Sequence, residues 1–211
     1  MIYENIIKDK EILNLLNEID ETDYIDANHG MKHALNVVNN VEKLTELLNI
    51  DETTKNYLKI AAFVHDVGQK YGKKEHVIKS VEIVSNLLKD KLDESWYKRI
   101  IKAIKLHHEK DYINSLDLFE HILLFADKMD FAKDRIVDKY VDKETNNYKI
   151  QSNIEKVDFF IEENVFVINI LLNNITEQEF KTWSFYNKIK TRIEEFANKI
   201  DMDYKIIYTN K

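Results

Sequence analysis

The chain of 211 residues contains no cysteine and no proline, and it has only three glycines. Without cysteine, disulfides and thiolate metal sites are excluded, so His and carboxylate side chains must hold any metal. No apolar run is long enough to cross a bilayer, and the N-terminus lacks the apolar core of a signal peptide, so we expect a cytoplasmic protein without membrane contacts. The glycines, Gly30, Gly68 and Gly72, each lie within a few residues of a histidine, which indicates tight turns or close approaches there.

The charge balance also limits the partners of the protein. The formal net charge is -7, and no long basic run interrupts it. A protein that grips long DNA or RNA through phosphates needs a basic surface, so we exclude that class. A small phosphorylated ligand, held by a few cations or by a metal, remains compatible with the composition.

The pattern of apolar residues divides the chain in two. Residues 1–141 show the spacing of amphipathic helices and predict a helical domain. Residues 142–211 change character, with two segments rich in β-branched and aromatic residues that predict a hairpin, then a helix over 177–200 and a last strand. The expected fold is therefore mainly α, with a small C-terminal α+β appendage of order β-β-α-β. We expect the appendage to pack on the helical domain, while its strand edges also suit a homodimer contact or a cover for the active site.

Four side chains with metal-ligand chemistry follow apolar helix positions. The apolar run 60–64 leads directly into His65 and Asp66, while His33 and Asp127 each lie three or four residues from apolar positions of other predicted helices. A single buried His is more often a hydrogen-bonded core residue, and one His-Asp pair is expected by chance. Four such groups on three helices can converge at the centre of a bundle, where imidazole and carboxylate suit Mn, Fe, Zn, Co or Ni, and also Mg.

In this order and context, the four residues resemble the HD-domain superfamily of metal-dependent phosphohydrolases. The resemblance rests on His33 with an apolar residue four positions later, on the apolar approach to His65-Asp66-Val67-Gly68, and on Ala126-Asp127-Lys128 closing a helix. It covers roughly residues 25–140 and implies an HD-type helical bundle whose four ligands hold a divalent metal ion.

Further histidines resemble the ligands of binuclear members. His76 opens the helix after the His-Asp loop, and His107 and His108 lie in the last turn of the next predicted helix, so the resemblance implies a second ion bridged by Asp66. A single ion would leave His76 and His107 to contact substrate phosphate or to support the ligands. No subgroup of the superfamily matches the residues around these positions fully, because Gln69 follows Gly68 and no proline follows His108. The substrate assignment therefore stops at the superfamily.

The activity that the resemblance implies is hydrolysis of a phosphate ester or anhydride, in a nucleotide or another small phosphorylated metabolite. Metal ions would clamp phosphoryl oxygens and activate a water that Asp66 orients or deprotonates. His29 is a candidate substrate contact or general acid, and further candidates for phosphate neutralisation are Lys70, Lys128 and Arg135. Two other functions stay open: a binuclear-iron oxygenase of the HD type, which the extra histidines also fit, and a sensor that binds metal or nucleotide without turnover.

Overall fold

The protein was examined as a computed structural model that describes residues 2–22, 27–72, 74–107, 117–139 and 141–211. It forms two compact units, one within Met1–Asp23 and Asn28–Asp127, and one within Tyr24–Ala27 and Lys128–Lys211. Compactness defines these units, so the domain boundary expected between residues 141 and 142 stays a prediction. No helix among the described residues has both the length and the apolar character needed to cross a membrane.

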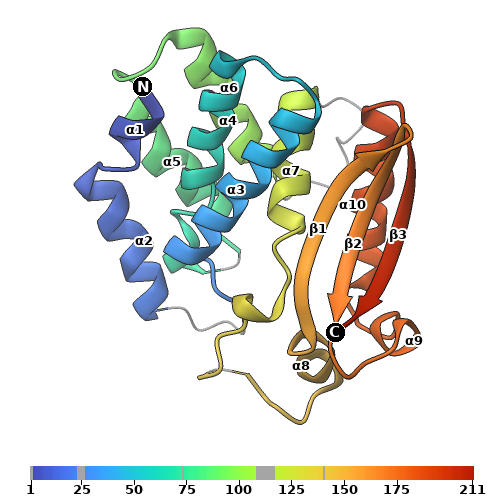
Figure 1. Ribbon diagram of the computed structural model, residues 1–211. Coiled ribbons are helices and arrows are strands. Elements are labelled where there is room, and N and C mark those ends of the chain that lie inside the picture. The colour runs from blue at the N-terminus through green and yellow to red at the C-terminus, as the bar shows by residue number, and fades with distance from the viewer. Residues whose placement is uncertain (1, 23–26, 73, 108–116, 140) are drawn as a thin grey trace. The chain divides into compact units, whose positions relative to one another are not determined.

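The first unit is a bundle of helices (Figure 1). Its helices, with one short 3-10 turn η1, are α1 (Ile2–Ile6), α2 (Lys10–Thr22), α3 (Met31–Leu47), α4 (Glu52–Val64), η1 (Gln69–Tyr71), α5 (His76–Leu88), α6 (Glu94–Leu106) and α7 (Leu118–Lys128). One face of α3 is apolar, and Val37, Val41 and Leu44 on this face are completely buried. Burying one such side chain contributes about 1.5–3 kcal/mol, so the face fixes the rotation of α3 about its axis.

Helix α4 is the central element of this bundle. Asp51 caps its first turn, where the Thr54 amide donates to the Asp51 carboxylate over 2.9 Å. Every residue from Ile60 to Val64 is at most 1% exposed, so the second half of the helix is buried on all sides. Neighbouring helices α1, α3 and α6 pack around it. The chain therefore leaves α4 in the interior of the unit, and the first two residues that follow are His65 and Asp66.

The second unit contains a three-stranded sheet. Its elements are η3 (Lys133–Arg135), α8 (Asn146–Gln151), β1 (Ile154–Glu162), β2 (Val165–Leu172), α9 (Glu177–Phe180), α10 (Tyr186–Lys199) and β3 (Asp203–Asn210). Strand order is β1-β2-β3, with β1 antiparallel and β3 parallel to β2. The predicted hairpin is confirmed, and its turn residues Glu163 and Asn164 both have positive φ, as a two-residue turn of this kind requires.

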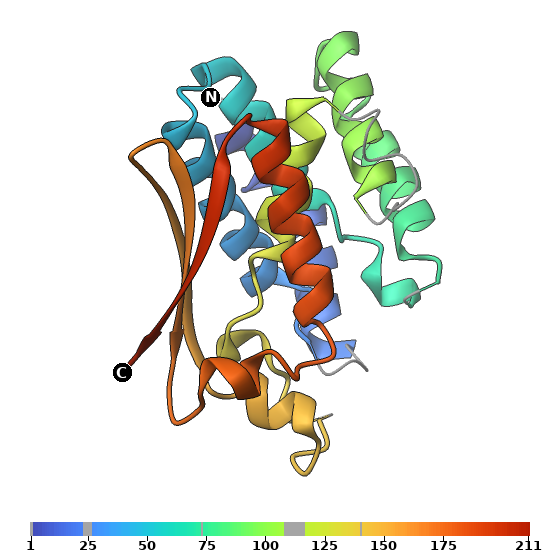
Figure 2. The same cartoon turned by 90° about the vertical axis from the view of Figure 1, so that its right-hand side faces the viewer.

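One face of the sheet packs against α10 (Figure 2). Phe166 of β2 and Phe196 of α10 are both fully buried, and their ring centroids lie 5.3 Å apart. The prediction of a single helix over 177–200 is wrong, because the chain forms two helices there, α9 and α10, with a break between them. Thr176 and Glu179 form a reciprocal capping box that starts α9 as a separate short helix. The predicted fold class, a helical bundle with a β-β-α-β segment, is confirmed.

Candidate metal centre

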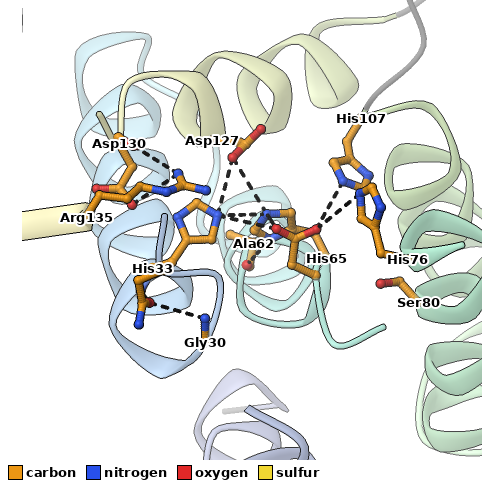
Figure 3. A network of polar contacts seen from close by, with 12 residues as sticks. Gly30, His33, Ala62, His65, His76, Ser80, His107, Asp127, Asp130 and Arg135 are labelled. Atoms are coloured by element: carbon orange, nitrogen blue, oxygen red, sulfur yellow. Dashed lines mark hydrogen bonds and ion pairs between the residues drawn. The ribbon is translucent and has the colours of Figure 1, made fainter. Parts of the chain in front are cut away.

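Six buried His and Asp side chains gather in the first unit. Each is at most 6% exposed, and together they come from α3, α4, α5, α6 and α7 or from the residues next to these helices. They are His33, His65, Asp66, His76, His107 and Asp127. Most of them lie within three residues of a helix end, so five helix termini meet around one point. Figure 3 shows His65 between the side that carries His33 and Asp127 and the side that carries His76 and His107.

The first group contains the four residues on which the sequence prediction rested. His33 Nε2 lies 3.3 Å from His65 Nε2 and 3.3 Å from Asp127 Oδ1. Asp66 Oδ2 lies 3.6 Å from His33 Nε2 and 3.4 Å from His65 Nε2. His65 Nε2 lies 3.9 Å from Asp127 Oδ1. The structure therefore brings together one donor atom from each of the four residues.

These separations suit ligands of one cation. Donors bound at about 2.1 Å lie about 3.0 to 3.4 Å apart in octahedral or tetrahedral geometry, close to the distances in the first group. His33, His65 and Asp127 form one cluster whose donor atoms lie within 4.8 Å of one another, and His65, Asp66 and His107 form a second. Two imidazoles with two carboxylates are donors of the type that divalent transition metals prefer.

The second group lies on the other oxygen of Asp66. His107 Nε2 is 3.3 Å from Asp66 Oδ1, and His76 Nε2 is 3.9 Å from the same oxygen. Asp66 Oδ1 is buried and accepts no hydrogen bond of good geometry from the described part of the chain. Burying a carboxylate oxygen in this way is costly unless a cation compensates. This orphaned oxygen, between two imidazole nitrogens, fits a second metal ion.

Two backbone carbonyls set the direction of the imidazole rings. His65 Nδ1 donates to Ala62 O over 2.8 Å, and His107 Nδ1 donates to Ile104 O over 2.5 Å. A carbonyl only accepts, so the proton of each ring must lie on Nδ1, and the lone pair of the neutral ring points from Nε2 into the cluster. These two rings are thus held in the tautomer that binds a metal through Nε2.

Charged groups in the cluster shift one another's pKa values. Burial alone would lower the pKa of His65, but the nearby carboxylates of Asp66 and Asp127 raise that pKa to about 9. Burial would likewise raise the pKa of Asp66, whereas His65 and His107 hold the pKa of this carboxyl well below its usual value. The carboxylates thus stabilise positive charge at the centre of the cluster, which is the electrostatic requirement of a cation site.

The remaining predicted site residues are not members of the six-residue cluster. His29 is half-buried just before α3, and its ring lies 5.9 Å from that of His33. The Lys70 ammonium is paired with Glu18 on α2 at 2.5 Å. Lys128 ends α7 directly after Asp127, and Arg135 contacts Asp130, donating to its carbonyl over 2.9 Å. Both residues belong to the second unit, and their roles stay predictions. His108 lies outside the described residues.

A contact that the sequence prediction missed holds Asp127 in place. The Asn40 side-chain amide on α3 donates to the carbonyl of Ala126 on α7 over 2.9 Å. Ala126 is among the last four residues of α7, whose carbonyls have no partner within the helix. The only signal in the sequence is spacing, because Asn40 follows His33 by seven residues and so lies two turns along the same face of α3.

Fold and site together define a helical domain whose buried His and Asp side chains could hold a metal ion. Residues 30–132 match the family model described as HD domain. This match confirms the resemblance to the HD-domain superfamily seen in the sequence. One similar crystal structure is a predicted HD superfamily hydrolase from an uncultured Thermotogales bacterium, with 28% identity over 58% of this chain and 68% of that chain, and a TM-score of 0.46. A comparison with curated proteins found no match.

Proposed function

We propose that this protein hydrolyses a phosphate ester or anhydride in a nucleotide or another small phosphorylated metabolite, with two divalent metal ions. The observation that carries the proposal is the cluster of six buried His and Asp side chains around Asp66. Its two groups of donors share this one carboxylate, whose Oδ2 faces the first group and whose Oδ1 faces the second. Such an arrangement is typical of a centre in which a carboxylate bridges two ions.

Divalent ions held there would supply positive charge against phosphoryl oxygens and a coordinated water of lowered pKa. The protein would contribute fixed geometry, because backbone carbonyls orient His65 and His107 and the Asn40 amide holds the end of α7. Asp66 would orient the attacking water, since it is the residue common to both groups of donors. His29, with its ring 5.9 Å from that of His33, would contact the phosphate or protonate the leaving group.

Cationic side chains would neutralise the remaining phosphate charge. Lys70 follows the His-Asp loop, but its ammonium is paired with Glu18, so a bound phosphate would compete with this carboxylate. Lys128 and Arg135 are proposed for the same role from their positions in the sequence. A net charge of -7 favours a small substrate that enters a local cationic site over a long polyanion that would meet the acidic surface.

The test is a turnover assay on protein purified without chelators. Metal content is measured first, and phosphate release is then followed over a panel of nucleotides and phosphorylated metabolites with each divalent metal. Asp66→Asn should reduce turnover by about 10²-fold or more, because it removes the charge shared by both groups. His121→Gln is the matched control, since His121 is also buried but belongs to neither cluster.

Three results would contradict the proposal. Hydrolysis that survives in the Asp66→Asn variant at the wild-type rate would remove this carboxylate from the reaction. Oxygen consumption by an iron-loaded protein, without phosphate release on any member of the panel, would instead support an HD-type oxygenase, which the four histidines of the cluster also fit. Metal binding without either reaction would support a sensor.

A further inference from the structure

A buried hydrogen bond joins the loop after Asp66 to the N-terminal part of α5. The backbone amide of Gly68 donates to Ser80 Oγ over 2.9 Å, and Ser80 is completely buried. In the sequence, Gly68 follows Asp66 by two residues, and Ser80 follows His76 by four, which is one helical turn. Figure 3 shows the Ser80 side chain next to His76. The bond therefore links the backbone segments that carry two residues of the second group.

The same two segments are also in direct backbone contact. A Cβ atom added at Gly68 would overlap the carbonyl oxygen of His76 and the amide nitrogen of Ser80, and would lie 2.8 Å from the carbonyl carbon of Lys79. Gly68 has a φ of -86°, which any residue can adopt, so space and not backbone conformation requires glycine here. The start of α5 thus lies directly on the Gly68 backbone, with the Ser80 hydroxyl fixing its position.

The His76 donor depends on this contact more than the other donors do. His76 Nε2 lies 3.9 Å from Asp66 Oδ1, whereas His107 Nε2 lies 3.3 Å from the same oxygen. His76 is the first residue of α5, so a small shift of this helix end carries the imidazole away from Asp66. We propose that Ser80 is a positioning residue for the second metal ion, because its hydrogen bond to Gly68 holds His76 within reach of Asp66.

This inference rests on the proposed two-ion centre. Replacing Ser80 by Ala would leave the Gly68 amide buried without an acceptor, and the loop and helix would move apart to let water reach it. Loss of a group that supports a ligand typically weakens metal binding 10- to 100-fold. The weakening should fall on the second ion, because His76 is the donor that α5 carries, whereas His33, His65 and Asp127 come from α3, from the end of α4 and from α7.

The experiment measures equilibrium binding of Mn²⁺ alone, by the electron paramagnetic resonance signal of the free ion. Wild-type protein should bind two ions, and Ser80→Ala should bind the first normally and the second 10- to 100-fold more weakly. Gly68→Ala keeps the Ser80 hydroxyl but fills the space that α5 occupies next to Gly68, so it should also weaken binding of the second ion. Ser85→Ala, a change of the same kind further along α5, is the matched control and should bind both ions as the wild type does.

The background variant His76→Ala separates positioning from general stability. If Ser80 acts through His76, adding Ser80→Ala to His76→Ala should not change Mn²⁺ binding any further, whereas a general loss of structure would weaken the first ion in both backgrounds. Two ions bound equally well by wild type and Ser80→Ala would overturn this inference and leave the proposed function intact. One ion bound by wild type, with no effect of His76→Ala, would overturn the two-ion centre and the role of Ser80 with it.

Discussion

Replacing Asn40 by Ala should weaken metal binding more than it weakens the fold. The variant loses one hydrogen bond, from the Asn40 amide to the carbonyl of Ala126. A bond of this type contributes about 1 kcal/mol to the free energy of unfolding, so the metal-free protein should lose about that amount. Because Ala126 immediately precedes Asp127, the freed end of α7 should also hold its carboxylate less firmly against His33, where the two now lie 3.3 Å apart.

The expected loss of metal affinity has its own magnitude, separate from the loss of the hydrogen bond. Loss of a supporting group raises a metal dissociation constant by about 10- to 100-fold, which at a fixed excess of metal removes about 1.4 to 2.8 kcal/mol of linked stabilisation. Urea unfolding should therefore show a loss of about 1 kcal/mol with a chelator and about 2.4 to 3.8 kcal/mol with saturating Mn²⁺. Asn39→Ala, at the exposed neighbouring position of α3, is the control. An equal loss in both conditions would show that the Asn40 bond only joins two helices, and would refute the reasoning.

Three further predictions concern the stability of the fold. Gly30→Ala should lower the free energy of unfolding by about 1–3 kcal/mol in urea, because its Cβ would overlap an Asp side chain of α2 and lie 2.8 Å from Leu16 O; wild-type stability would contradict this close packing. Asp51→Ala should lower the thermal midpoint by removing the cap of α4, whereas Asp93→Ala should not, because among the described residues Asp93 starts α6 without a side-chain cap bond. Tyr204 donates to a Glu carboxylate of α10 over 2.7 Å, which raises the pKa of Tyr204 to about 12. Its contribution to stability is therefore complete below the unfolded pKa of about 10 and is lost as the pH rises through about 12. Urea unfolding across this range should show a smaller loss for Tyr204→Phe than for wild type, and equal losses would contradict the assignment.

The sequence predicted the members of the first donor group because each one carries a local signal. His33 and Asp127 lie on apolar helical faces, and the apolar run before His65 is long enough to be a buried helix. The hairpin was predictable for the same reason, since the turn between β1 and β2 separates two runs of β-branched and aromatic residues. In each case, neighbours in the chain determine the structure.

The supporting contacts were not predictable, because they join residues that are distant in the chain. Asn40 and Ala126 are separated by 86 positions, and no periodicity within α3 indicates which carbonyl its amide will meet. Ser80 appears in the sequence only as a small polar residue on a mostly apolar helix. The break between α9 and α10 was missed for a different reason, because residues 181–185, where the break lies, contain neither glycine nor proline.

The placement of the donors at helix ends follows from the hydrogen bonds that helices leave unmade. The last four carbonyls of a helix have no amide partner within it, and when buried they need another donor. Ala62 in α4 and Ile104 in α6 are two such carbonyls, and each accepts from the Nδ1 proton of a histidine three residues later. Each of these contacts satisfies the carbonyl of a buried residue at a helix end and fixes the tautomer whose Nε2 can bind a metal. The carbonyl of Ala126 in α7 is a third, and its partner is the Asn40 amide. A histidine directly after a helix whose end is buried therefore serves the fold and the metal centre through one hydrogen bond, which explains why His65 and His107 can be buried and still be correctly oriented before any ion binds.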